Sequence, residues 1–264
     1  MAWKLYEGNC FDYLPLLEDK SIDMILCDLP YGTTDCKWDT PLPLDELWVE
    51  YKRVIKDNGA IVLTASQPFT TRLISSNYDM FRYEWIWNKK IPSGMTYAKF
   101  QPMRQHEHIL IFSLDSTVYN PQMIKREFPI KGGGMSKGET TNNQNKKALK
   151  KTYSYKNPIT ILKFDKIRKD SLHPTQKPVA LFEYLIKTYT NENDLVLDNC
   201  AGSGTTGVAC ENLNRNSIMM EKEPEYCQII KDRMATVQEL QLEARKQKTL
   251  NEFNRQATLD MPAK

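Results

Sequence analysis

Few metal-binding residues and no long apolar run occur in this sequence. Its three histidines and six cysteines are scattered, and no two cysteines form a C-x-x-C pair. A structural zinc site needs about four clustered ligands. We therefore predict no metal and expect reduced, mostly buried thiols. No apolar stretch approaches membrane-spanning length, and no charged-then-apolar segment opens the chain. These absences predict no membrane partner and a cytoplasmic location.

The net charge is small but unevenly distributed. The chain has 36 Lys and Arg against 33 Asp and Glu, a net charge of +3. Residues 118–169 hold 13 Lys and Arg against three acids, which is +10, so the remainder carries −7. In this basic segment the apolar residues recur with neither the period of a helix nor that of a strand, although aromatic residues stand at Tyr153, Tyr155 and Phe164. Its charge favours a polyanionic partner such as nucleic acid, and a solvated lysine-rich loop is the alternative.

Outside the basic segment, apolar runs alternate with helical periods, which predicts an α/β fold. Strands are expected at 22–27, 60–64, 83–87, 108–112, 194–198 and 217–220. Helices are expected from Leu44 to a stop at Asn58-Gly59, from about 67, from 178, over 205–213, and from 223. This order implies a largely parallel sheet covered by helices on both faces.

A glycine turn at residues 198–204 follows one predicted strand and precedes a helix. Small residues let the backbone approach a ligand, and a helix N-terminus offers free N–H groups. Glu221, at the end of the next strand, can accept bonds from both hydroxyls of a ribose. Residues 202–207 also fit the dinucleotide fingerprint G-x-G-x-x-G. A dinucleotide fold needs several strands after that turn, and only 217–220 follows, so a dehydrogenase is disfavoured.

Three short motifs resemble those of a known enzyme family. Asp28-Leu29-Pro30-Tyr31, at the end of the first predicted strand, resembles D-P-P-Y. His173-Pro174-Thr175-Gln176-Lys177-Pro178 resembles H-P-T-x-K-P. The glycine turn resembles D-P-F-x-G-S-G, with Asn199 and Cys200 where Pro and Phe are usual. In this order the motifs are similar to those of the amino-methylating DNA methyltransferases in their circularly permuted β group.

The resemblance implies an S-adenosylmethionine-dependent enzyme that methylates an exocyclic amine of a base extruded from double-stranded DNA. Such an amine is a poor nucleophile because its lone pair is delocalised. The Asp28 carboxylate and the Leu29 carbonyl would each accept an N–H bond. Pro30 would stiffen the turn, and Tyr31 would stack on the base. Positioning and electrostatics would do most of the work, and no cysteine nucleophile is required.

For the cofactor, the resemblance implies residues from all three motifs. It adds Asn9-Cys10, which stands where the family often has an acid that faces the cofactor adenine. The expected set is Asn9, Cys10, Asp28, His173, Thr175, Lys177, Asp198, Cys200, Gly202, Ser203, Gly204, Thr205 and Glu221.

The implied fold is a Rossmann-like, mostly parallel α/β methyltransferase sheet, circularly permuted, with an inserted basic target-recognition segment. The expected parts are a catalytic half at 1–117, the target-recognition segment at 118–171, a cofactor-binding half at 172–234 and a polar helical tail at 235–264. Within the insert, Lys146, Lys147, Lys150 and Lys151 are expected to bind DNA. Gln101–Glu107 is also expected to face DNA.

The prediction of which base is methylated depends on the residue type at position 28. Asp at the first position of the Asp28 motif favours adenine N6, because Ser is commoner there in enzymes for cytosine N4. A cytosine-N4 or RNA methyltransferase is the first alternative, and a catalytically inactive DNA-binding protein with this fold is the second. A homodimer, a cognate endonuclease, the recognition sequence and the role in restriction, phage protection or regulation are left open.

Overall fold

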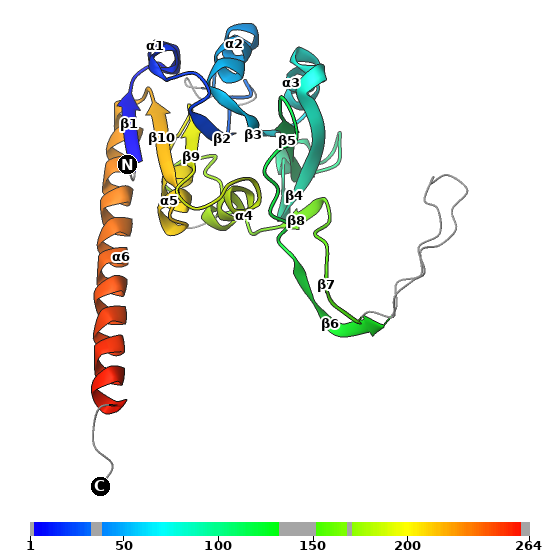
Figure 1. Cartoon of the computed structure of the whole chain (residues 1–264). Helices are drawn as coiled ribbons and strands as arrows, with labels where there is room; N and C mark the ends of the chain where they lie inside the picture. The colour runs from blue at the N-terminus through cyan, green and yellow to red at the C-terminus, as the bar shows by residue number, and fades with distance from the viewer. Residues whose placement is uncertain (1–2, 33–38, 132–151, 168–170, 260–264) are drawn as a thin grey trace. The chain divides into compact units, whose positions relative to one another are not determined.

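The computed structural model describes residues 3–32, 39–131, 152–167 and 171–259 (Figure 1). The chain divides into two compact units. One comprises Met1–Asn120 with Thr160–Lys264, and the other is Pro121–Ile159. The residues that line the candidate site all belong to the first unit.

A single twisted sheet organises the first unit. Among the described residues it has eight strands in the order β1-β10-β9-β2-β3-β5-β4-β8. Their bounds are β1 Trp3–Glu7, β2 Ile22–Cys27, β3 Ile55–Ala65, β4 Phe81–Ser93, β5 Arg104–Phe112, β8 Ile161–Lys163, β9 Leu195–Asp198 and β10 Asn216–Glu221. Only β5 in this described sheet runs antiparallel to its neighbours β3 and β4, and every other pair is parallel. The predicted mostly parallel sheet is confirmed.

Helices cover both faces of this sheet (Figure 1). They are α1 Cys10–Tyr13, α2 Leu44–Val54, α3 Phe69–Ser76, α4 Val179–Tyr189, α5 Thr205–Asn212 and α6 Pro224–Leu259, with short 3₁₀ turns at Leu14–Leu16, Tyr78–Met80 and Met95–Tyr97. Alternate side chains of β2 face opposite layers. Ile25 and Cys27 pack with α1, α2 and α3, whereas Met24 and Leu26 pack with α4 and α5. Burial on both faces explains why β2 is an unbroken apolar run.

The order of the strands explains why so few strands follow the glycine turn in the sequence. β9 and β10 pair with each other, and strands from the beginning of the chain complete the sheet on both sides of them. Val196 of β9 pairs with Met24 of β2, and Ser217 of β10 pairs with Trp3 of β1. The strands that a dinucleotide fold would place after the turn therefore come before it in the sequence, as circular permutation requires.

The predicted end of the helix that begins at Leu44, which is α2, is wrong. α2 stops at Val54, and Asn58 and Gly59 lie inside β3 instead of ending a helix. Ile55 adopts extended backbone angles and pairs with Ile22 of β2 while its side chain is fully buried. The ladder between β2 and β3 has an irregularity after this pair, and Asn58-Gly59 falls within it. Burial of a β-branched side chain in the sheet thus outweighs the local stop signal.

The basic segment contains strands that its sequence did not predict. β6 Ile124–Lys131 and β7 Thr152–Lys156 form an antiparallel ribbon in the second unit. Nearly every ribbon residue is exposed, so no apolar alternation marks these strands. β8 belongs instead to the first unit, where Leu162 is buried opposite Trp87 of β4. The second unit, Pro121–Ile159, therefore spans fewer residues than the expected segment 118–171. Lys146, Lys147, Lys150 and Lys151 lie outside the described residues.

Within the described part of the chain, no helix combines the length and apolar character needed to cross a bilayer.

Candidate active site

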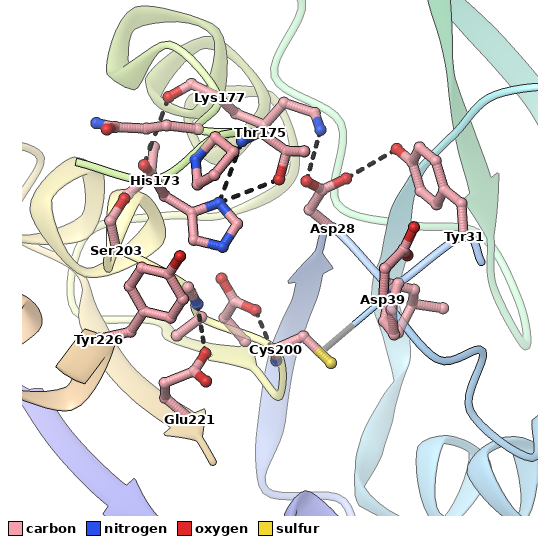
Figure 2. Close-up of a pocket in the computed structure, with 18 of the residues that line it drawn as sticks. Asp28, Tyr31, Asp39, His173, Thr175, Lys177, Cys200, Ser203, Glu221 and Tyr226 are labelled. Atoms are coloured by element: carbon pink, nitrogen blue, oxygen red, sulfur yellow. Dashed lines mark hydrogen bonds and ion pairs between the residues drawn. The ribbon is translucent and has the colours of Figure 1, made fainter. Parts of the chain in front are cut away.

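The two turns singled out in the sequence meet at one edge of the sheet. Asp28 follows β2, Asp198 ends β9 and Glu221 ends β10. These strands are parallel neighbours, so their carboxyl ends lie together, where open α/β sheets bind ligands. A cavity of about 330 Å³ lies at this edge, and residues of both turns and of the His173–Pro178 motif line it (Figure 2).

Three donors orient the Asp28 carboxylate. The Tyr31 hydroxyl donates to Oδ1 at 2.8 Å, and the Thr64 hydroxyl at the end of β3 donates to the same oxygen. Lys177 Nζ lies 2.5 Å from Oδ2 (Figure 2). Burial, together with the neighbouring Asp28 charge, raises the pKa of Tyr31 well above its ordinary value, so Tyr31 remains a donor. Asp28 is therefore a preorganised hydrogen-bond acceptor.

The Tyr31 ring packs against another aromatic ring. It stacks on Phe69 of α3 with ring centroids 5.2 Å apart and planes 23° from parallel. Gly32 in the same turn donates its N–H to Asp39 Oδ1 at 2.9 Å, which fixes the path of the backbone. The four residues predicted for catalysis all line the cavity: Asp28, Leu29, Pro30 and Tyr31.

A buried network of charges extends from Asp28 along one wall of the cavity. Lys177 Nζ lies 3.4 Å from Glu107 Oε2, and Lys89 Nζ lies 3.2 Å from Glu107 Oε1. The side chains of both lysines are only 6% exposed. Burial by itself would raise the pKa of Glu107, but Lys177 and Lys89 together lower it below its ordinary value. Likewise Asp28 and Glu107 raise the pKa of Lys177 against the effect of burial. Two carboxylates and two lysines thus form one cluster of ion pairs.

Glu107 was not predicted as a residue of the site. It lies in β5 inside the sheet and lines the cavity, and the expectation that Gln101–Glu107 faces DNA stays a prediction. Lys89 and Thr64 were not predicted either. Neither belongs to a recognised motif, and the role of each depends on the register of β3, β5 and β4. A threonine among the apolar residues of β3, at the end where ligands bind, was the one signal available.

The glycine turn between β9 and α5 has a conformation that side chains disfavour. Gly202 and Gly204 adopt φ angles of +52° and +76°. A Cβ atom at Gly204 would also lie 3.0 Å from Ile230 Cγ1 of α6. Arg233 of α6 donates to the Ser203 carbonyl, which ties the turn to the helix. The turn is therefore fixed by its own backbone and by α6.

Asp198 accepts hydrogen bonds from within the same turn and from the start of α5. The Cys200 N–H donates to Oδ1 at 3.1 Å, and the Thr206 hydroxyl donates to Oδ2. Burial raises the pKa of Asp198 to about 6 even though these donors lower it. Thr205, the first residue of α5, reaches the Lys177 carbonyl at 3.4 Å, so the glycine turn contacts the His173–Pro178 motif.

Glu221 presents a fixed carboxylate to the cavity. The Gly202 N–H donates to Oε2 at 2.8 Å, and the Glu223 N–H donates to Oε1 at 2.9 Å. Each oxygen has about two acceptor sites, so each retains capacity for another donor. Burial raises the pKa of this carboxyl. The arrangement is compatible with the predicted bonds to two ribose hydroxyls.

His173 lines the same cavity as Glu221. Its ring packs against Tyr226 with centroids 4.4 Å apart and approaches Gly202 (Figure 2). Its Nδ1 lies 3.1 Å from Thr175 Oγ1. Burial lowers the pKa of His173, which favours a neutral imidazole. Tyr226 was not among the predicted site residues.

The departures from the family motifs have structural partners. Asn199 is buried and accepts a 2.5 Å hydrogen bond from the Tyr51 hydroxyl of α2. The Asn9 side chain accepts from the Phe11 N–H and caps α1, while Cys10 and Cys200 line the same region of the cavity. Burial raises the pKa of the neighbouring Cys27 to about 12, so that thiol is no nucleophile at neutral pH. Within the described ranges, no three His, Cys, Asp or Glu side chains are arranged to hold a metal.

The sheet, the glycine turn and the two acids that end β9 and β10 define the class of Rossmann-like methyltransferases. The family model N6_N4_Mtase, described as DNA methylase, matches residues 22–232. The chain therefore belongs to the N6/N4 DNA methylase family. Members of this family use S-adenosylmethionine, so the predicted cofactor is confirmed.

Relatives match over most of the chain. The Type II methyltransferase M.HpaI of Haemophilus parainfluenzae is 29% identical, over 89% of this chain and 74% of its own length. The Type II methyltransferase M1.MboII of Moraxella bovis is 28% identical, over 84% and 93%. Among solved structures, the M1.HpyAVI–SAM complex is 27% identical with a TM-score of 0.59, covering 88% of this chain and 99% of that one.

The cytosine-N4-specific PvuII DNA methyltransferase shares the fold. Its TM-score is 0.60 at 17% identity, over 90% of this chain and 91% of that one. The fold alone therefore does not distinguish adenine from cytosine.

Proposed function

We propose that this protein transfers the methyl group of S-adenosylmethionine to the N6 amine of an adenine extruded from double-stranded DNA. The observation that carries the proposal is the Asp28 carboxylate, which Tyr31, Thr64 and Lys177 orient at the cavity. An amine placed there would donate one N–H to Asp28 and another to the Leu29 carbonyl. Both bonds favour a tetrahedral nitrogen with an available lone pair.

The cavity is suited to the cofactor. Glu221 retains acceptor capacity on both oxygens, and the glycine turn lines the cavity at the N-terminus of α5. When bound, S-adenosylmethionine supplies an electrophilic methyl group. We propose that it is held by Asn9, Cys10, Asp28, His173, Thr175, Lys177, Asp198, Cys200, Gly202, Ser203, Gly204, Thr205 and Glu221.

The test of the site is Asp28→Ala. The variant should lose methyl transfer by more than about 100-fold, because an oriented acceptor acts mainly in the transition state. Its affinity for S-adenosylmethionine, measured by calorimetry, should fall much less than the rate, because the other residues proposed to hold the cofactor remain. Asp79→Ala, at an exposed turn residue, is the control and should behave as wild type. Turnover near wild type in Asp28→Ala would contradict the proposed site.

Adenine is preferred over cytosine because of the aspartate in the Asp28 motif. The same chemistry would serve cytosine N4, which remains the second candidate. Nucleoside analysis of DNA and RNA methylated in parallel separates the candidates: N6-methyladenine in DNA supports the proposal, and N4-methylcytosine or methylated RNA refutes it. Sequencing the methylome of expressing cells would also give the recognition sequence. The Type II names of the relatives support a restriction–modification role.

The second unit is the proposed DNA-reading surface. Its register pairs Lys125 with Tyr155 and Ile130 with Tyr153, so both tyrosines share one face of the ribbon with Lys125. Both rings are exposed, which suits contact with sugars and bases. The lysines at 146, 147, 150 and 151, outside the described residues, are proposed to bind phosphates.

Charge reversal of those four lysines tests this assignment. Loss of four phosphate contacts would reduce the slope of log affinity against log salt by up to about 4. An unchanged slope would refute the assignment of these lysines, while leaving the proposal for the active site intact.

A further inference from the structure

An unusual acceptor lies next to the Asp28 carboxylate. Oε2 of Glu107 is buried, and no donor in the described part of the chain reaches it with hydrogen-bond geometry. Lys177 Nζ nevertheless lies 3.4 Å away as an ion-pair partner. Lys89 holds the other oxygen of Glu107 at 3.2 Å. Glu107 therefore has one satisfied oxygen and one unused oxygen that points toward Lys177.

Asp28 has the opposite condition, since both of its oxygens already have donors. Tyr31 and Thr64 donate to Oδ1, and Lys177 donates to Oδ2 at 2.5 Å. Tyr31 and Thr64 fill both acceptor sites of Oδ1, so the N–H bond that the proposed role of Asp28 requires falls to the remaining site of Oδ2. The Lys177 ammonium at 2.5 Å weakens Oδ2 as an acceptor, and a longer contact with Lys177 would strengthen it.

We propose that Glu107 is a positioning residue that receives Lys177 from Asp28 as the target amine enters. This inference rests on the proposed function of Asp28. The Lys177 ammonium would need to move only roughly 0.5 Å closer to Oε2 to reach ordinary hydrogen-bond distance. The shift lengthens the 2.5 Å contact with Oδ2 of Asp28 by at most the same distance, which weakens the hold of Lys177 on Oδ2, and it gives the unused oxygen of Glu107 its donor.

The charges of the cluster keep the free-energy cost of this shift small. Lys89 and Lys177 balance Asp28 and Glu107 before and after it, so no buried charge loses its partner. Lys89 keeps Glu107 in place, because its contact is with Oε1 and not with the oxygen that receives Lys177. Lys177 thus has two acceptors of the same charge within reach, and the arrival of the amine shifts Lys177 from Asp28 toward Glu107.

The experiment is Glu107→Gln, which keeps the shape of the side chain and removes the charge that draws Lys177 from Asp28. The single-turnover rate with saturating cofactor and DNA should fall at least about tenfold. The dissociation constant for S-adenosylmethionine should stay within about threefold. Glu107→Asp keeps the charge and should recover part of the rate. Glu84→Gln is the matched control, because Glu84 lies on β4 and pairs instead with His108 at 2.7 Å. It should transfer methyl groups at the wild-type rate.

A second variant separates positioning from simple charge balance. In Lys89→Met with Glu107→Gln, one positive and one negative charge are removed together, so the cluster stays neutral. If Glu107 serves only to neutralise Lys89, this variant regains the wild-type rate and the proposal is overturned. If Glu107 receives Lys177, the double variant stays slow.

The two levels of proposal fail differently. A wild-type rate in Glu107→Gln while Asp28→Ala is inactive overturns the positioning role alone. An active Asp28→Ala overturns the proposed site itself. Thermal unfolding of each variant identifies any loss that is due to misfolding, and such a loss with equally weakened cofactor binding would assign Glu107 a structural role instead.

Discussion

Asp198 should make the stability of this protein depend on pH. Its carboxyl is buried at the end of β9, and burial raises its pKa from 3.8 to about 6. In the unfolded chain the carboxyl ionises at the lower value, so between the two values the folded state binds more protons. Stability is therefore highest below the unfolded pKa and falls as pH rises through about 6.

The size of the effect follows from the two pKa values. Each pKa unit corresponds to about 1.4 kcal/mol, so the loss is about 3 kcal/mol in total. About 2 kcal/mol of it falls between pH 4.5 and 7.5, because part of the ionisation of the unfolded state is complete at pH 4.5. Asp198→Asn has nearly the same shape and does not titrate. The variant should gain about 2 kcal/mol relative to wild type across this range.

The assay is urea denaturation of wild type and Asp198→Asn at several pH values without cofactor. The difference between the two free energies of unfolding isolates the titration of Asp198 from that of other groups. Thr206→Val provides a second measurement, since the Thr206 hydroxyl donates to Asp198 and lowers its pKa. Its loss should move the transition above pH 6. A difference that does not vary with pH would refute the assignment of a buried carboxyl with a raised pKa.

Two further predictions concern parts that support the site. Gly204→Ala should cost at least about 1 kcal/mol more than Gly94→Ala in urea denaturation. Both glycines have positive φ, but only Gly204 would place its Cβ 3.0 Å from Ile230, and Gly94 has open space; equal costs would contradict this. Tyr51→Phe should lower the free energy of unfolding by about 1–3 kcal/mol, because it leaves the buried oxygen of Asn199 without its donor. Unchanged thermal and urea stability would show that the hydrogen bond contributes nothing.

Much of the fold was predictable from local patterns. β2 and α4 lie where their apolar periods predicted them, because burial on both faces or on one side imposes those periods. β1, by contrast, is only partly buried and gave no clear alternation. β6 and β7 are exposed on both faces, so no pattern of burial exists to be detected. Prediction thus succeeded where burial was one-sided or complete and failed where it was absent.

The candidate site shows the same division. The sequence by itself determined where the Asp28 turn and the glycine turn lie, because each follows an apolar run that local periodicity identifies as a buried strand. Only the tertiary structure decided that Glu107 and Lys89 join Lys177 at Asp28. Their meeting depends on the antiparallel register of β4 and β5 and on the parallel pairing of β2 with β9, which are distant in the chain. Such pairings arise from non-local packing, so no short stretch of sequence encodes them.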